Sequence, residues 1–230
     1  MERCPRRLSG ATEFILVTLV CYWWAIAASA VVITGQLMQV SLPIQVNDGQ
    51  MLTLVGVELV GLAVASWIGY ARGWSVWSFG LRPTWRGTGA GVVLATTTAA
   101  SLTLVGLLVN VAYPGAVRFE PLPGSLRLTV VLLVSTVNPV FEEAMGVGYF
   151  THALRRFGMW PAVLASAGFR TLLHAYQGLT AVVIMLPLGM AFAVVYWRYG
   201  RLWPLVTAHA AFSLAALVPL TLVAEPGNGL

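Results

Sequence analysis

Six polar side chains in the C-terminal half of the chain interrupt stretches that are otherwise apolar. They are Glu142, Glu143, Arg170, His174, His209 and Ser213. A charge at the centre of a membrane helix costs roughly 2.5–3.5 kcal/mol on insertion scales, so ionisable residues there indicate a functional site. Carboxylates and imidazoles together can supply the base, the acid and the charge stabilisation that hydrolysis of a peptide bond requires.

The two adjacent carboxylates, Glu142 and Glu143, are predicted to have different roles. Neighbouring residues on an α-helix point about 100° apart, so one carboxylate can face a polar site while the other pairs with a basic side chain. Pro139 precedes them and is expected to bend the helix, which gives the carboxylates space and water. The alternative is an acidic pair at the end of a membrane helix.

The basic residues of these segments are spaced so that they share helix faces. Arg170 lies four residues before His174, and His209 lies four residues before Ser213. A buried arginine requires a carboxylate, and we predict that Arg170 pairs with one of the two glutamates. The alternatives are an arginine whose charged end extends to the interface, and histidines that make only structural hydrogen bonds.

The composition requires a membrane protein. Of the 230 residues, 58% are hydrophobic and 9% are charged, against roughly 45–50% and about 25% in soluble domains. The mean hydropathy is +0.82. All 13 basic residues are arginines and the net charge is +5, which we interpret as a signal for orientation in the bilayer and not for nucleic-acid binding. We predict an all-α, polytopic transmembrane helix bundle.

Seven stretches approach or exceed the roughly 20 apolar residues that a membrane span needs. They are Phe14–Thr34, Met51–Ala71, Thr88–Ala112, Leu126–Phe150, Trp160–Gln177, Leu179–Trp197 and Leu202–Ala224. With a cytoplasmic N-terminus, most arginines fall on the cytoplasmic side, which is the positive-inside pattern. Only Gly178 separates the fifth and sixth stretches, so a tight hairpin or a partly re-entrant pair is an alternative there. We favour an uncleaved first helix over a signal peptide.

The distribution of polar residues predicts how the chain is organised. We treat residues 1–230 as a single membrane domain, in which residues 1–125 form supporting helices and residues 126–224 form the catalytic core. Glu58 is the acidic residue inside the second stretch. It has no role in a protease site, where it is either structural or lines an access path.

At these motifs the chain resembles the CPBP family of intramembrane proteases, also called the Abi or CAAX-protease family. The family has a Glu-Glu motif, a second motif that ends in His, and a third in which Asn or Asp follows His by four residues. Glu142–Glu143, His174 and His209 match this pattern in order and spacing. The resemblance covers roughly residues 126 to 220.

The sequence departs from the common family pattern at three positions. Val147 stands where the first motif commonly has Arg, Arg170 stands where the second has Phe, and Ser213 replaces the Asn or Asp of the third. The first two departures are compensatory, because the arginine has moved to the neighbouring helix. This combination looks like a bacterial subgroup, which implies a multi-pass protein of the plasma (inner) membrane.

The resemblance implies that Glu142 activates a water molecule with help from His174. His209, with Ser213 in the place of Asn, would stabilise the oxyanion, and an ion pair between Glu143 and the arginine of the second motif would orient these groups. The resemblance favours catalysis without a cofactor. The alternative is zinc, because Glu142, His174 and His209 are also a possible ligand set.

These features predict an endopeptidase that cleaves a membrane-anchored peptide or protein. Its partners are this substrate and the lipid bilayer, with no nucleic acid, and the pattern specifies no oligomeric state. We do not extend the prenylated substrate of CAAX proteases to this chain. One alternative is a non-catalytic immunity or binding protein on the same scaffold. The other is a proton-coupled transporter, for which Glu58 is the residue to test.

Overall fold

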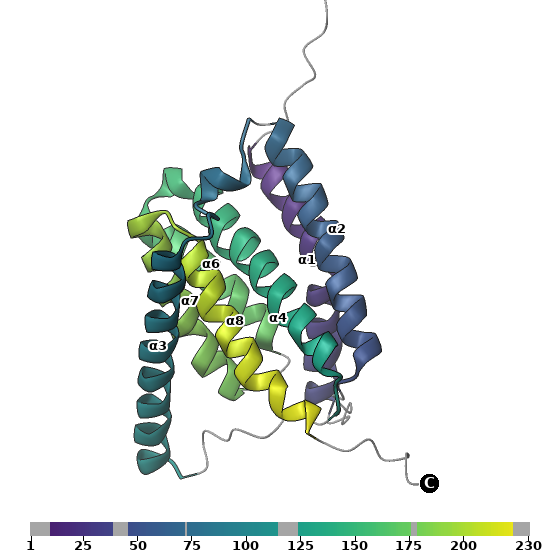
Figure 1. Cartoon of the computed structure of the whole chain (residues 1–230), viewed down its shortest axis with the longest axis vertical. Helices are drawn as coiled ribbons and strands as arrows, with labels where there is room; N and C mark the ends of the chain where they lie inside the picture. Colours follow the sequence, from purple (N-terminus) through teal and green to yellow (C-terminus); the bar gives the residue numbers. More distant parts are fainter. Residues whose placement is uncertain (1–9, 39–45, 72, 115–123, 176–178, 223–230) are drawn as a thin grey trace, which may run out of the picture.

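The computed structural model describes residues 10–38, 46–71, 73–114, 124–175 and 179–222. Within these ranges the chain is a bundle of helices without a β-strand (Figure 1). The long helices are α1 (Gly10–Leu37), α2 (Asp48–Ala71), α3 (Trp85–Ala112), α4 (Leu128–Glu142), α6 (Met159–His174), α7 (Leu179–Tyr199) and α8 (Trp203–Leu217). A π-helix (Glu143–Tyr149) and the short α5 (Phe150–Ala153) extend α4.

The predicted all-α polytopic bundle is confirmed. Six helical segments are long and apolar enough to cross a membrane, and α4 qualifies together with the π-helix and α5. The fifth predicted span, Trp160–Gln177, is the exception among the described residues, because α6 has only 16 residues. At 1.5 Å per residue α6 is about 24 Å long, short of a hydrocarbon core of about 30 Å. It packs along α7 in the bundle.

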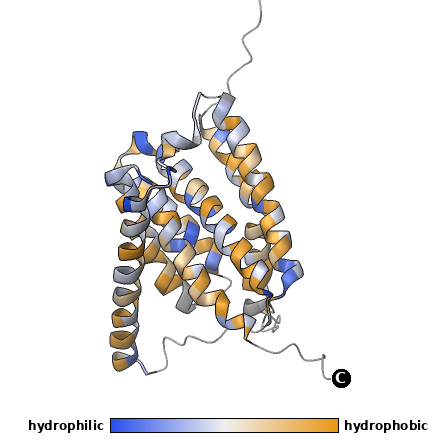
Figure 2. Ribbon diagram, viewed as in Figure 1, coloured by the Kyte–Doolittle hydropathy of each residue, from blue (hydrophilic) through white to orange (hydrophobic). Residues whose placement is uncertain are grey.

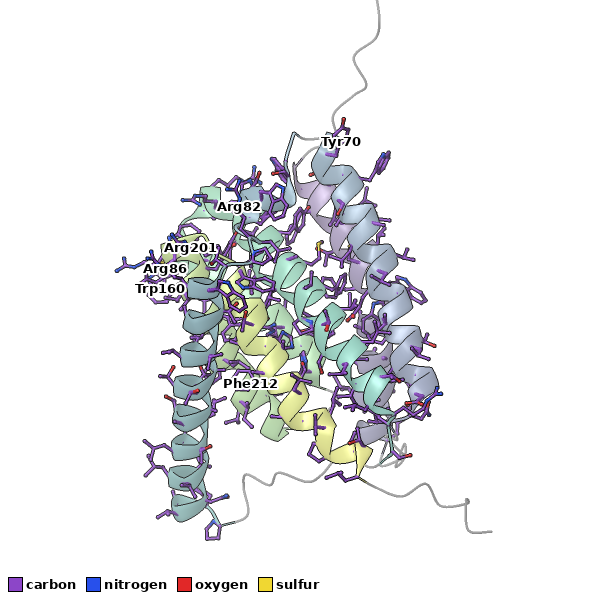
Figure 3. The ribbon with its side chains drawn as sticks, viewed as in Figure 1. Tyr70, Arg82, Arg86, Trp160, Arg201 and Phe212 are labelled. Carbon is purple, nitrogen blue, oxygen red and sulfur yellow. The ribbon has the colours of Figure 1, made fainter. Side chains whose placement is uncertain are left out.

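Arginines gather at one end of the bundle, as the positive-inside pattern predicts. Arg82, Arg86 and Arg201 lie at the same end as Trp160 (Figure 3). Apolar residues dominate the outer helices α2 and α3, while polar residues occur midway along the central helices (Figure 2). The cytoplasmic location of the arginine-rich end stays a prediction.

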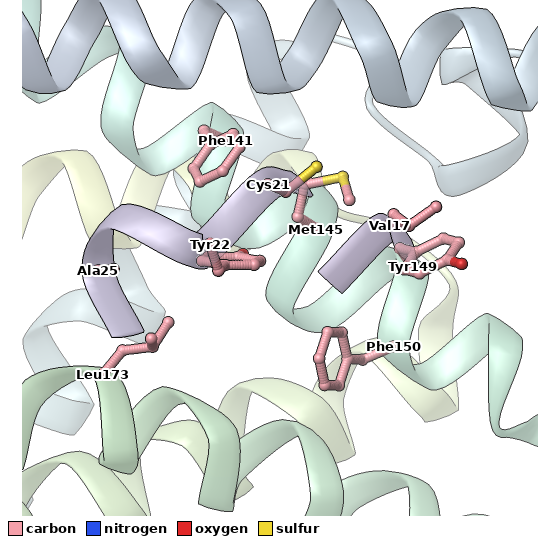
Figure 4. Packing of buried hydrophobic residues seen from close by; sticks show 9 residues of the cluster. All are labelled: Val17, Cys21, Tyr22, Ala25, Phe141, Met145, Tyr149, Phe150 and Leu173. Carbon is pink, nitrogen blue, oxygen red and sulfur yellow. The ribbon is translucent and has the colours of Figure 1, made fainter. Parts of the chain in front are cut away.

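An apolar cluster joins α1 to the segment that carries the two glutamates (Figure 4). Its buried members are Val17, Cys21, Tyr22, Ala25, Phe141, Met145, Tyr149, Phe150 and Leu173. The Tyr22 ring lies 5.2 Å from the Phe141 ring and 4.9 Å from the Phe169 ring, between centroids. This packing holds the end of α4 and its π-helical extension against both α1 and α6.

Helix α3 packs mainly against α8, through small residues. Gly87, Gly91 and Ala95 are buried and spaced four residues apart, so they form one stripe along the helix. A Cβ atom added to Gly91 would lie 2.5 Å from the Cβ of Thr207 and 2.6 Å from the carbonyl oxygen of Pro204. The two backbones can therefore approach closely only because this position lacks a side chain.

Candidate active site

The two glutamates lie where the α-helical backbone changes to a π-helix. Helix α4 contains Pro139 and ends at Glu142, and the π-helix begins at Glu143. Proline removes an N–H donor from the α-helical ladder, and π-helical turns occur frequently at functional sites. Neighbouring residues on a helix point about 100° apart, and the two environments differ: the Glu143 side chain is fully buried, while 18% of the Glu142 side chain is exposed.

Hydroxyl groups satisfy backbone carbonyls of the π-helix. Thr151 Oγ1 donates to the carbonyl oxygens of Val147, at 2.5 Å, and Gly148, at 3.2 Å. Ser166 Oγ, from α6, donates to the carbonyl oxygen of Gly146 at 2.6 Å. In a membrane interior an unsatisfied carbonyl costs several kcal/mol, so these hydroxyls stabilise the irregular backbone that carries the glutamates.

Glu143 is the buried centre of an ion-pair cluster formed by three helices. Arg170 Nη2, from α6, donates to Glu143 Oε1, which is the predicted ion pair. His209, from α8, places Nδ1 2.8 Å from the same oxygen. Because a carboxylate accepts, Nδ1 carries the proton and Nε2 is directed away from Glu143. The Arg170 guanidinium also lies 5.5 Å from the centre of the Phe192 ring.

His174 is oriented by the backbone of its own helix. Its Nδ1 lies 2.9 Å from the carbonyl oxygen of Arg170. A carbonyl only accepts, so Nδ1 donates and the neutral imidazole has a free lone pair on Nε2. The i, i+4 spacing of these two residues therefore fixes a tautomer that can accept a hydrogen bond from water.

Glu142 is held by a residue that sequence reasoning did not select. Asn138, one turn earlier on α4, donates from Nδ2 to Glu142 Oε1 at 3.1 Å. The other oxygen, Oε2, lies 3.5 Å from Arg170 Nη2. Electrostatic interactions link Glu142 to His174 and His209 as well. The signal for Asn138 was present, because a polar residue four positions before Glu142 shares its helix face.

Two further sequence expectations concern Ser213 and metal binding. Ser213, on α8, is partly buried and makes no hydrogen bond to another described residue, so its part in an oxyanion site stays a prediction. In the described ranges, no three His, Cys, Asp or Glu side chains are grouped as a metal site would require. Glu142, His174 and His209 as zinc ligands stay an untested alternative.

The buried cluster of Glu143, Arg170 and His209 thus lies between three helices of the bundle. In the comparison with known families, residues 124–215 match the family described as Rce1-like, type II CAAX prenyl endopeptidase. This match covers less than half of the chain, but it includes all three motifs. The matched segment is therefore similar to CAAX-type endopeptidases. No curated protein and no solved structure matches the chain.

Proposed function

We propose that the protein is an intramembrane endopeptidase in which Glu142 is the general base, without a metal ion. The observation that carries this assignment is the contrast between the two glutamates. Glu143 Oε1 already accepts from Arg170 and His209, inside a fully buried environment. Glu142 is partly exposed, and its Oε2 lies 3.5 Å from its neighbour Arg170. Glu142 is thus the carboxylate that can reach a water molecule.

The proposed first step is attack by water. Glu142 takes one proton from the water molecule, and the oxygen forms a bond to the carbonyl carbon of the scissile peptide. His174 Nε2 accepts a hydrogen bond from the other water hydrogen and so orients the nucleophile, since its Nδ1 is engaged with the Arg170 carbonyl. When the C–N bond breaks, Glu142 returns its proton to the leaving nitrogen.

The charges of the cluster support His209 as the group that stabilises the oxyanion. Two ionised glutamates and Arg170 leave one net negative charge, which a protonated His209 balances. Glu143 accepts from His209 Nδ1 at 2.8 Å, so it stabilises the imidazolium and directs Nε2–H outward. When Glu142 becomes protonated and the oxyanion forms, the total charge stays at zero. A preorganised donor at the oxyanion typically contributes about 2.7–4 kcal/mol.

The substrate class follows from the location of the site. The catalytic groups lie between membrane-spanning helices, so the peptide bond must reach them from the bilayer, and we infer a membrane-anchored substrate. The matched family is described as a CAAX prenyl endopeptidase. We infer that this chain acts on anchored peptides without requiring the prenyl group. We also infer that the protein resides in a bacterial plasma (inner) membrane.

The test is a cleavage assay in nanodiscs. Internally quenched peptides carrying an acyl anchor, a transmembrane anchor or a farnesylated CAAX terminus are presented to the wild type and to E142Q, E143Q, H174A and H209A. The matched control is H152A, because His152 lies against the rings of Trp74 and Phe79 and touches none of the catalytic groups. We expect E142Q to lower kcat by about 10²–10⁴ and H152A to leave it unchanged.

Other outcomes separate the alternatives. A larger loss in E143Q than in E142Q would reverse the roles of the glutamates. Inhibition by a chelator with recovery on adding zinc would replace the metal-free mechanism. Cleavage of the farnesylated probe alone would restore the prenyl requirement. If the wild type cleaves no probe, the non-catalytic binding protein becomes the better interpretation.

A further inference from the structure

Glu58, on α2, is a buried acidic residue that the proposed mechanism does not use. Its side chain is inaccessible to solvent. Its Oε1 accepts a hydrogen bond from Asn138 Nδ2 at 2.6 Å, and its Oε2 has no hydrogen-bond partner among the described residues. Glu58 is separated by 80 residues from Asn138, and the two meet because α2 packs along α4.

The Asn138 carboxamide joins two carboxyl groups. The same nitrogen that donates to Glu58 at 2.6 Å donates to Glu142 Oε1 at 3.1 Å. An NH₂ group has two hydrogens, so it can serve both oxygens at once. Glu58, Asn138 and Glu142 thus form a chain of hydrogen bonds from the interior of the α2–α4 interface to the catalytic carboxylate.

Glu58 does not share the ion pairs of the active site. Arg170 contacts Glu142 and Glu143, and the described residues offer Glu58 no cation. An unpaired charge in a protein interior costs several kcal/mol. Glu58 therefore acts as a neutral carboxylic acid, which accepts from Asn138 through its carbonyl oxygen.

We propose that Glu58 is a positioning residue for Glu142, acting through the Asn138 carboxamide. This inference rests on the proposed function, in which Glu142 is the base. Asn138 lies one turn before Glu142 on α4, and a carboxamide held by Glu142 alone would have other orientations open to it. The hydrogen bond to Glu58 on α2 fixes the orientation of the amide. The fixed amide then holds Glu142 Oε1 and leaves Oε2 free to contact water. Catalytic groups must be held within about 0.5 Å of the productive geometry.

The experiment uses the anchored peptide that the wild type cleaves fastest, and measures kcat and KM for E58L, E58Q and N138L. In E58L the Asn138 amide loses its acceptor on α2 and keeps only Glu142. We expect kcat to fall about 10–100-fold, as for other outer-shell partners, with little change in KM. In E58Q the glutamine carbonyl still accepts from Asn138, so kcat should stay within about threefold of wild type, less than the net contribution of one hydrogen bond.

The double variant E58L/N138L tests whether the two residues act in one chain. If Glu58 acts through Asn138, the double variant has the kcat of N138L alone, because the link is already broken. Multiplied losses would overturn the proposal, as would wild-type kcat in E58L or an equal loss in E58Q. The matched control is D48A, which removes the contact of α2 with Arg127 at the other end of the α2–α4 interface and should leave kcat unchanged.

A parallel E142Q sample separates this proposal from the proposed function. If E142Q keeps wild-type kcat, the assignment of the base has failed. If E142Q is inactive while E58L is fully active, only the positioning proposal has failed. Each variant is also melted in detergent, so that a loss of kcat in a folded E58L protein is distinguished from a loss of fold.

Discussion

Helices α2 and α3 are both long, apolar and N-terminal to the catalytic motifs, yet they differ in their relation to the site. Glu58, on α2, accepts a hydrogen bond from Asn138, which also donates to Glu142, the proposed base. Helix α3 has no ionisable residue after Arg86 and packs mainly on α8 through glycine and alanine. Hydropathy alone does not distinguish a helix that supports chemistry from one that supports only packing.

The largest expected effect lies in the ion-pair cluster of Glu143, Arg170 and His209. R170M leaves the fully buried Glu143 carboxylate without its cation, and breaking a buried pair typically costs about 3–5 kcal/mol. We expect this loss in the free energy of unfolding, measured by titration with SDS in mixed micelles, together with loss of cleavage. R170M/E143Q should regain part of the stability but no activity, and an unchanged stability in R170M would contradict the burial of the pair.

The next effect tests the α3–α8 interface. G91A places a Cβ 2.5 Å from Thr207 Cβ and 2.6 Å from the Pro204 carbonyl oxygen, whereas a Cβ at Gly89 meets nothing within 4 Å. Overpacking costs about 1–3 kcal/mol, so G91A should destabilise the protein by this amount and G89A should not. Equal effects of the two variants would show that α3 does not use this stripe. Cleavage by folded G91A is expected to remain.

Much of the site was predictable because a charge in a membrane interior must be compensated. The three motifs, the pairing of Arg170 with a glutamate and the shared face of Arg170 and His174 all follow from this rule and from helical spacing. Helical spacing left open which glutamate pairs with Arg170, and only the family resemblance assigned the ion pair to Glu143. The structure shows that the Glu143 side chain is fully buried against Arg170 and His209, whereas the Glu142 side chain stays partly exposed.

The remaining features depend on contacts between distant parts of the chain. The hydrogen bond between Glu58 and Asn138 joins two helices that hydropathy treats separately. Sequence reasoning therefore assigned Glu58 no role in a protease site. The fifth predicted stretch, Trp160–Gln177, also extends beyond α6, which ends at His174. Tyr176 and Gln177 of that stretch, and Gly178 after it, lie outside the described residues.

A smaller effect is expected where α2 meets α4 at the end opposite to the arginine-rich one. Asp48 contacts the Arg127 side chain and accepts from its backbone N–H at 3.0 Å. The Arg127 side chain is 71% exposed, and exposed ion pairs contribute about 0–1 kcal/mol. D48N should therefore lower the free energy of unfolding by no more than this and leave cleavage intact. A loss of cleavage would mean that the whole α2–α4 interface, and not the Glu58 contact, controls the site.

The smallest effect is expected on the outer surface of α3. Leu108 is 60% exposed, and in a bilayer its neighbours are lipid chains, which contact alanine as readily as leucine. L108A should change the free energy of unfolding by less than about 0.5 kcal/mol. Leu205, on α8, is fully buried, and L205A is the matched substitution, with an expected loss of about 2–5 kcal/mol. If L108A were as harmful as L205A, that face of α3 would be covered by protein and not by lipid.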